Sequence, residues 1–366
     1  MVVDPPGTLS PSRRNALDPA PSTTYIRQDE TMKISSTKFH SRPRRSPRRW
    51  GLTLLVLATF SASTALAAKP IQVLTTIGML GDVAAEVAGE CAAVEAMMGP
   101  GVDPHLYRAS AGDVTKLARA DLILYAGLGL EGRLSDVLAN FSRRKPTVAV
   151  AELAVPATEL RYVGTSTIDP HVWMDVALWR GTAAVIRDAL LTHPDIDPEC
   201  AAGITARTSA YEEQLAVLDA WVREAVASIP ERQRVLVTAH DAFQYFGSAY
   251  GLEVVGIQGI STDAEAAVAD IRRVAEVVAQ REVPAIFVES TINQRTVDAV
   301  IDAVRRRGAS VTLGGQLYSD AMGADRTPDG TYIGMLVRNV TNVVAALGGA
   351  VPALPPGLSE WEGRWQ

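Results

Sequence analysis

The stretch ITARTSAYEEQLAVLDAWVREAVASI, residues 204–229, contains neither glycine nor proline. Apolar and small side chains recur in it at helical spacing, with charged residues between them: Ala206, Ser209, Tyr211, Leu215, Leu218, Trp221, Val222 and Ala225. The pattern predicts one helix over about 198–229. Such a helix is a stiff rod between the segments that precede and follow it.

Short apolar runs alternate with amphipathic stretches on both sides of this helix. The runs predict buried strands at 71–78, 92–99, 121–127 and 147–153 before it, and at 234–240, 252–259, 285–291 and 310–318 after it. Helical patterns fall between them at 111–120, 131–141, 264–282 and 296–308. Strands that alternate with helices indicate parallel sheets flanked by helices. The sequence therefore predicts an α/β protein with two lobes, 68–197 and 230–350, joined by the rigid helix 198–229 and followed by a tail, 351–366.

The first 67 residues predict an N-terminal extension and an export signal. Five arginines between positions 42 and 49 precede the uncharged stretch 51–67, which ends in the small-x-small pattern of a cleavage site. We expect cleavage after Ala67 and a periplasmic protein. No cysteine lies at that point, so we expect no lipid anchor. The sequence leaves open whether translation starts at Met1 or at Met32.

The charge of the exported part argues against nucleic acid as a partner. The whole chain has a net charge of −6, and residues 1–67 are basic, so the remainder is more acidic still. Phosphate contacts need a basic surface. Two cysteines, Cys91 and Cys200, follow the signal. The sequence is equally compatible with a disulfide between these cysteines and with two separate small residues in the core.

Two of the five histidines stand in the same tripeptide, Asp-Pro-His, at 103–105 and 169–171. The proline restricts the backbone before each imidazole, which reduces the entropy lost when the ring is ordered around a metal. Both tripeptides fall in loops that follow strands or open helices. The repetition indicates that His105 and His171 serve one site.

His240 and Asp320 complete the candidate set, because each falls at or just beyond the end of a predicted strand. Ligands bind at that edge of open α/β sheets, and two facing lobes turn the edge into a cleft. Imidazole suits zinc, copper, iron and nickel, while carboxylate shifts the preference toward manganese. We predict a divalent transition-metal site in the interlobe cleft, formed by His105, His171, His240 and Asp320.

Three further acids lie near these ligands. Asp103 and Asp169 are expected either to orient groups of the site or to cap their own turns. Glu289, near the end of a predicted strand, is expected to bind the metal or orient a ligand, or else to pair with a basic residue across the cleft. Trp173 is expected to pack the wall of the site.

Five segments together resemble the zinc/manganese substrate-binding proteins of bacterial ABC transporters (cluster A-I, or cluster 9). They are GPGVDPHLYRAS at 99–110, DPHVWMD at 169–175, VLVTAHDAFQYFGSAYGLEVVGIQGISTDAEA at 235–266, AIFVEST at 285–291 and GGQLYSDAMG at 314–323. The resemblance runs from about 71 to 347. It implies two α/β lobes joined by a rigid helix, with the metal held by His105 and His171 from the first lobe and by His240 and Asp320 from the second.

The resemblance also implies a cargo and a partner. A protein of this kind captures its metal in the periplasm and delivers it to a membrane ABC permease, without enzymatic activity, and we expect a monomer. Many zinc-dedicated members carry a histidine-rich loop in the first lobe, whereas residues 131–169 here contain no histidine. Manganese is therefore the favoured cargo in the cell and zinc the second candidate, although a His3Asp site should bind zinc more tightly at equilibrium.

Two other functions are kept as alternatives. A zinc-dependent hydrolase would activate water at an open fourth position, but Asp320 fills that position, and neither HExxH nor GxSxG occurs in the chain. A binder of an organic iron or vitamin complex would share the rod-linked lobes. Such a protein would not need four convergent metal ligands.

Overall fold

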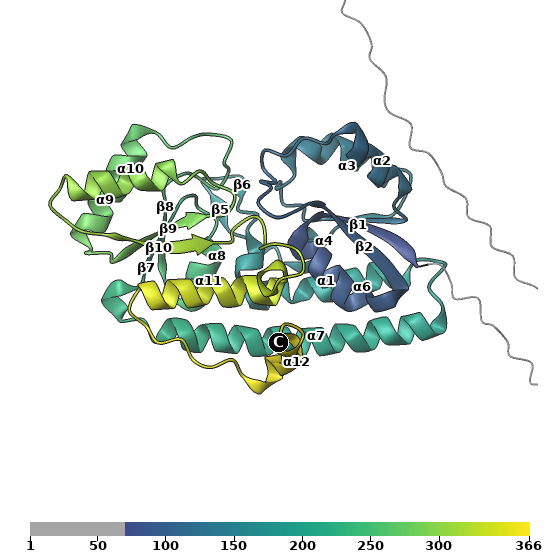
Figure 1. Cartoon of the computed structure of the whole chain (residues 1–366). Coiled ribbons are helices and arrows are strands. Elements are labelled where there is room, and N and C mark those ends of the chain that lie inside the picture. The colour runs from purple at the N-terminus through teal and green to yellow at the C-terminus, as the bar shows by residue number, and fades with distance from the viewer. Residues whose placement is uncertain (1–69) are drawn as a thin grey trace, which may run out of the picture. The chain divides into compact units, whose positions relative to one another are not determined.

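The computed structural model describes residues 70–366 (Figure 1). The predicted signal peptide, its cleavage point after Ala67 and both candidate start residues lie outside this part of the chain. Within 70–366, no helix combines the length and the apolar character needed to cross a membrane.

The predicted rod is helix α7, Pro198–Ala227, whose 30 residues span about 45 Å. Its first turn is capped by Asp197, whose carboxylate accepts the N–H of Cys200 at 2.8 Å. Helices from both halves of the chain pack on it, namely α1, α5 and α6 before it and α8 and α11 after it. Figure 1 shows α7 extending beneath both sets of strands.

The buried face of α7 differs from the predicted stripe at its N-terminal end. Ile204 and Thr208 are buried there, whereas Ala206 and Ser209 are exposed. From Tyr211 onward the buried positions agree with the prediction. The error arises because small residues such as alanine and serine carry little information about which face is apolar.

The first half of the chain forms a four-stranded parallel sheet in the order β2-β1-β3-β4. Its strands are β1 Ile71–Ile77, β2 Ala92–Met98, β3 Leu122–Tyr125 and β4 Thr147–Ala149. The helices around it are α1 Gly78–Ala88, α2 Ala111–Arg119, α3 Ser135–Ser142, α4 Val150–Ala154, α5 Val176–Trp179 and α6 Gly181–Leu191. A small antiparallel hairpin, β5 Tyr162–Val163 and β6 Thr167–Ile168, was not predicted.

The strand predicted at 147–153 is wrong in its second half. The chain turns into helix α4 at Val150, and the N–H groups of Ala151 and Glu152 donate to the carbonyl of Ala126. Val150 and Ala151 are fully buried in this turn. A short apolar run does not by itself distinguish a strand from a buried helical turn.

The second half forms two parallel strand pairs, and β7 lies beside β9. The strands are β7 Val235–Thr238, β8 Glu253–Gly256, β9 Ala285–Glu289 and β10 Thr312–Leu317. The helices are α8 Gln244–Tyr250, α9 Val268–Gln280, α10 Arg295–Arg305 and α11 Tyr332–Ala346. Short 3-10 turns complete the chain at Gly89–Cys91 (η1), Gly132–Leu134 (η2), Val172–Met174 (η3), Glu231–Gln233 (η4), Pro328–Gly330 (η5) and Pro356–Leu358 (η6). We propose 68–197 and 230–350 as the bounds of the two lobes, since each range contains one of these sets of strands.

Residues 351–366, expected to be a tail, pack against the rest of the protein. Helix α12, Ser359–Gly363, buries Trp361. The indole N–H of Trp361 donates to the hydroxyl of Thr331 at 2.9 Å, and Thr331 caps the N-terminus of α11. Arg364 forms an ion pair with Glu86 of α1. The C-terminal segment therefore joins α1 to the start of α11.

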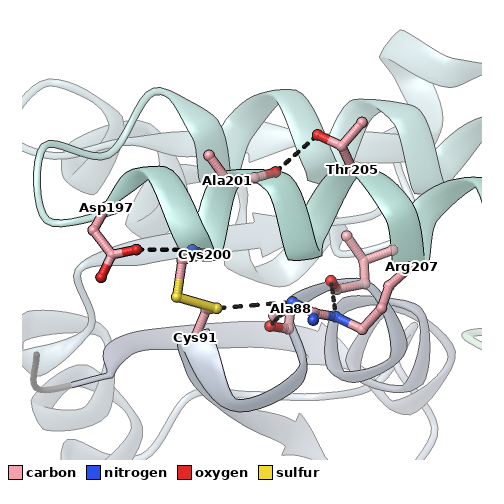
Figure 2. Close-up of a disulfide and its surroundings, with 8 residues drawn as sticks. Ala88, Cys91, Asp197, Cys200, Ala201, Thr205 and Arg207 are labelled. Atoms are coloured by element: carbon pink, nitrogen blue, oxygen red, sulfur yellow. Dashed lines mark hydrogen bonds between the residues drawn. A yellow bond between two sulfur atoms is a disulfide. The ribbon is translucent and has the colours of Figure 1, made fainter. Parts of the chain in front are cut away.

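Cys91 and Cys200 form a disulfide, which resolves the alternative left open by the sequence (Figure 2). Beside it, the guanidinium of Arg207 in α7 donates to the carbonyls of Val87 and Ala88 at the end of α1, at 3.0 and 2.6 Å. Val87 and Ala88 are the last two residues of α1, where the carbonyl groups of a helix are open to partners from outside it. The N-terminal part of α7 is therefore fastened to the first lobe both covalently and by hydrogen bonds.

Candidate metal centre

The four predicted ligands come together at one buried point between the lobes. Their ligand atoms all lie within 4.8 Å of one another. The Nε2 atom of His171 is 3.3 Å from Nε2 of His105 and 3.4 Å from Nε2 of His240. The carboxylate of Asp320 lies 3.3 Å from His171, 3.3 Å from His240 and 3.7 Å from His105. Three residues of the set are at most 2% exposed, and His105 is 7% exposed.

The two Asp-Pro-His tripeptides form the same backbone turn. In one, the carboxylate of Asp103 accepts the N–H of His105 at 2.9 Å, and in the other Asp169 accepts the N–H of His171 at 3.1 Å. An aspartate that bonds the backbone two residues on is a common turn device. Both aspartates therefore cap their own turns, which was one of the two roles expected for them.

Asp169 also has the other expected role, because it orients a ligand of the site. Its Oδ1 atom also lies 2.7 Å from Nδ1 of His171 and accepts the ring proton there, which leaves Nε2 directed at the other ligands. Asp103 does not reach the ring of His105 in this way. Its second oxygen instead accepts the hydroxyl of Thr262, 2.6 Å away in the loop after β8. The repeated motif thus orients one imidazole and links the first lobe to the second.

Glu289 holds His240 from the neighbouring strand. One carboxylate oxygen of Glu289 accepts the backbone N–H of His240 at 2.8 Å, and the other lies 2.5 Å from the ring atom Nδ1. The pairing with a basic residue across the cleft, which had been an alternative, is therefore wrong, because the partner is a histidine of the same lobe. Strand β8 passes close to the residue after His240. A Cβ on Gly256 would come within 2.8 Å of the backbone of Asp241, so only glycine fits there without a shift.

Within residues 70–366, neither oxygen of the buried carboxylate of Asp320 has a hydrogen-bond partner. Among the residues that the structure describes, only the three imidazoles face it at ion-pair distance. Buried polar groups are nearly always satisfied, so an orphaned carboxylate calls for a ligand. A cation placed among these four side chains would supply it.

Burial and neighbouring charges set the protonation of the ligands. Burial acts to lower the pKa of His171, but the hydrogen bond of its ring to Asp169 and the negative charges of Asp169 and Asp320 outweigh it and raise that pKa to about 9. Burial opposes a charge on His240 as well, yet Glu289 and Asp320 hold its pKa well above the usual value. Burial lowers the pKa of His105. Burial also acts to raise the pKa of Asp320, but His240 and His171 hold it well below its usual range. Without metal, two imidazolium rings therefore face an ionised carboxylate.

The spacing of the ligand atoms fits a tetrahedral ion. Donors bound at about 2.0–2.1 Å around such an ion lie roughly 3.3–3.4 Å from each other. Four of the contacts, from His171 to His105, His240 and Asp320 and from His240 to Asp320, have this spacing, while His105 lies 3.7 Å from Asp320 and the whole set of ligand atoms lies within 4.8 Å. Catalytic zinc sites keep one position open for water. Four convergent protein donors instead describe a closed site that holds an ion.

A cavity of about 720 Å³ borders the site on the side of His105. Residues of both lobes line it, including Leu128, Arg133 and Pro170 of the first and Ile260 and Asp263 of the second. Arg133 and Asp263 form an ion pair between the lobes. His105, the most exposed of the four predicted ligands, is the one that lines this cavity.

Contacts between the lobes were missed by sequence reasoning. Asp103 bonds Thr262 across 159 positions, and the indole N–H of Trp173 donates to the carbonyl of Ser319 across 146 positions. Trp173 was expected only to pack the wall of the site. No local spacing signals such pairs, because they depend on how the two lobes meet.

Known proteins resemble this chain in sequence and in structure. A family model described as zinc-uptake complex component A, periplasmic, matches residues 73–346. The zinc-binding protein TroA of Treponema pallidum is 45% identical over 296 residues, covering 81% of this chain and 94% of the relative. The manganese-binding lipoprotein MntA of Bacillus subtilis is 42% identical over 280 residues, covering 76% and 90%. The solved structure of the periplasmic zinc-binding protein TroA from Treponema pallidum has a TM-score of 0.73 at 46% identity and covers 76% of this chain and 99% of that one.

Proposed function

This chain belongs to the family of the periplasmic zinc-uptake complex component A, and from that premise we propose that it captures manganese or zinc with His105, His171, His240 and Asp320. It is a metal-binding component of an ABC transporter and not an enzyme. The captured ion is its cargo, which it delivers to a membrane ABC permease for import.

One observation carries the assignment of the ligands. Two side chains from each half of the chain converge at a buried point, and the carboxylate among them has no hydrogen-bond partner in the part of the chain that the structure describes. A hydrolase would need an open coordination position. A binder of an organic iron or vitamin complex would need a polar or aromatic lining for the complex, rather than four metal donors at one point.

The ion itself is proposed as manganese in the cell, with zinc as the second candidate. Relatives of both kinds are similar to this chain, one named for zinc and one for manganese. The near-tetrahedral spacing and the three imidazoles favour zinc at equilibrium. Selection of manganese in the cell would then depend on the supply of each metal as well as on affinity.

Capture and release follow from where the ligands lie. The ion approaches through the cavity beside His105 and is bound when both lobes contribute their ligands. Release requires that His240 and Asp320 of the second lobe move away from the first lobe when the protein docks on the permease. Because α7 is a continuous helix fastened to the first lobe by the disulfide and Arg207, this movement is a small displacement rather than a wide hinge opening.

We also propose that the protein is exported by a cleavable signal, acts in the periplasm as a monomer and carries no lipid. The relative MntA is named a lipoprotein. Here no cysteine stands at the predicted cleavage point after Ala67, which supports the unlipidated form.

The test is metal analysis of the protein purified from its own periplasm, together with the variants His105→Ala and Asp320→Ala. We expect one equivalent of metal in the wild type and little in either variant, while His193→Ala, at a half-exposed histidine outside the site, keeps its metal. A deletion strain should grow poorly on manganese- or zinc-limited medium. Intact metal binding in both site variants would exclude the proposed ligands, and turnover of ester or amide substrates lost on chelation would favour the hydrolase.

A further inference from the structure

Each of the three histidine ligands is held by a hydrogen bond to a carboxylate, whereas the side chain of Asp320 is not held in this way. Asp169 holds the ring of His171 and Glu289 holds the ring of His240, each through a hydrogen bond to Nδ1. His105 is held at its backbone by Asp103. The carboxylate of Asp320 has no hydrogen-bond partner in the described part of the chain. Its position therefore depends on the backbone that carries it.

That backbone is bound by a residue of the other lobe. The indole N–H of Trp173 donates to the carbonyl of Ser319 at 2.8 Å, and this carbonyl belongs to the peptide group that immediately precedes Asp320. Trp173 is fully buried and lies two residues after the ligand His171. Its ring packs edge-on against the imidazole of His171, with centroids 5.2 Å apart. One side chain thus touches a ligand of the first lobe and the backbone of a ligand of the second.

Trp173 is itself held in place from behind. The hydroxyl of Tyr332 in α11 donates to the carbonyl of Trp173 at 2.8 Å, and Tyr332 is also fully buried. Because Tyr332 holds the backbone of Trp173 and the buried ring packs against His171, the indole has little freedom to rotate. The direction of its N–H toward Ser319 is therefore set by the fold.

We propose that Trp173 is a positioning residue for the metal site, which holds Asp320 in register with the first-lobe ligands and slows release of the ion. This inference rests on the proposed function. The hydrogen bond joins the two lobes, so it forms only when the ligands converge and is lost when the second lobe moves away. Because this hydrogen bond is present when the metal is held and absent when it is released, it adds to metal affinity.

The chain offers a matched control in Trp179. This indole is also fully buried and packs against Trp173 at a centroid distance of 6.3 Å. Its N–H, however, meets no hydrogen-bond partner among residues 70–366. Replacing either tryptophan by phenylalanine removes a similar volume from the same cluster, but only Trp173→Phe removes a hydrogen bond to the metal site.

The experiment compares Trp173→Phe and Trp179→Phe in the full exported protein. Zinc-loaded protein is mixed with excess chelator to measure the dissociation rate, and the unfolding temperature of metal-free protein is measured alongside. We expect zinc to dissociate roughly tenfold faster from Trp173→Phe than from the wild type, as loss of a buried hydrogen bond implies. Trp179→Phe should release zinc at the wild-type rate, while both variants lower the unfolding temperature.

A second substitution removes the donor without changing the ring. Trp173→benzothienylalanine replaces the N–H by sulfur at nearly constant volume, so it tests the hydrogen bond even if Trp173→Phe does not fold. Faster zinc release from this variant, and unchanged release from Trp179→benzothienylalanine, would support the proposal. Equal release rates from the wild type and both Trp173 variants would overturn it. Absence of zinc binding in the wild type would instead count against the proposed function.

Discussion

The Nδ1 atom of His240 lies 2.5 Å from one oxygen of Glu289, and the other oxygen of that carboxylate accepts the backbone N–H of the same histidine at 2.8 Å. Both residues are buried. The double contact fixes the ring and its backbone together, so the Nε2 atom can point only toward the other ligands. Glu289 is therefore as much a part of the site as the residues that would touch the ion.

Glu289→Gln should lower metal affinity about 10- to 100-fold, the usual effect of losing a carboxylate behind a ligating histidine. The amide can still accept the backbone N–H, but it no longer carries the charge that pairs with the ring. Competition with a chromogenic chelator measures the affinity. Asp103→Asn is the comparison, because Asp103 does not touch its histidine ring, and it should have the smaller effect. Equal losses in both variants would contradict the role assigned to Glu289.

Metal binding should release protons at neutral pH. The pKa of His171 is raised to about 9 and that of His240 lies well above its usual value, so both rings are protonated without metal, whereas His105 is neutral because its pKa is lowered. An ion must displace the protons on Nε2. Calorimetry in buffers of different ionisation enthalpy should show about two protons released per ion. Metal affinity should rise as the pH increases toward 9, and an affinity independent of pH between 6 and 8 would exclude this protonation pattern.

Zinc should displace manganese from the purified protein. Three imidazoles and a near-tetrahedral arrangement favour zinc in the usual order of divalent metals. Equilibrium dialysis against equal concentrations of both ions, followed by elemental analysis, measures the preference. Retention of manganese under these conditions would mean that the site imposes a geometry unfavourable to zinc.

The disulfide should stabilise the fold without contributing to metal binding. Cys91 and Cys200 are separated by 109 residues, so the bond restricts a long loop of the unfolded chain. The double variant Cys91→Ser and Cys200→Ser should lose about 2–5 kcal/mol of unfolding free energy, measured by denaturant titration of metal-free protein. Metal affinity measured on the same variant should match the wild type, and a large loss of affinity would show that the attachment of α7 also sets the ligand geometry.

Asp82 should make the stability of the metal-free protein depend on pH. Its carboxylate accepts the N–H of Tyr332, and burial raises its pKa from 3.8 to about 7, with Glu86 adding to the rise while the Tyr332 N–H, Arg364 and Tyr211 oppose it. A folded-state pKa above the unfolded value means that the folded protein holds this proton more tightly. The contribution to stability is therefore present at low pH and is lost as the pH rises from about 4 to about 7.

Asp82→Asn removes this titration and keeps the shape of the side chain. The difference in unfolding temperature between the wild type and Asp82→Asn isolates the effect from that of other carboxylates. We expect the difference to favour the variant progressively as the pH rises from 4 to 7 and to level off above that range. A difference that stays constant over these pH values would show that Asp82 is ionised throughout.

Much of the architecture could be predicted from local pattern. The continuous helical signal at 204–229 predicted α7, and alternating strands and helices predicted two sets of parallel strands. The four ligands could be chosen because metal-binding residue types stood at strand ends, which is a local property. Errors arose where local pattern is weak, as at Val150, where an apolar run continues as a helix, and at α9, which begins at Val268 rather than near 264.

Local sequence was enough to identify the side chains available to the site and the strand ends near which they stand, because strand and helix periodicities depend on neighbouring residues. What each side chain contacts depends on the folded arrangement. Glu289 pairs with His240 across 49 positions, Cys91 with Cys200 across 109 and Trp173 with Ser319 across 146. The two Asp-Pro-His tripeptides are identical in sequence, yet Asp169 holds its own histidine ring and Asp103 reaches Thr262 instead. These contacts arise from how the lobes pack on α7 and on each other, and no spacing along the chain encodes that packing.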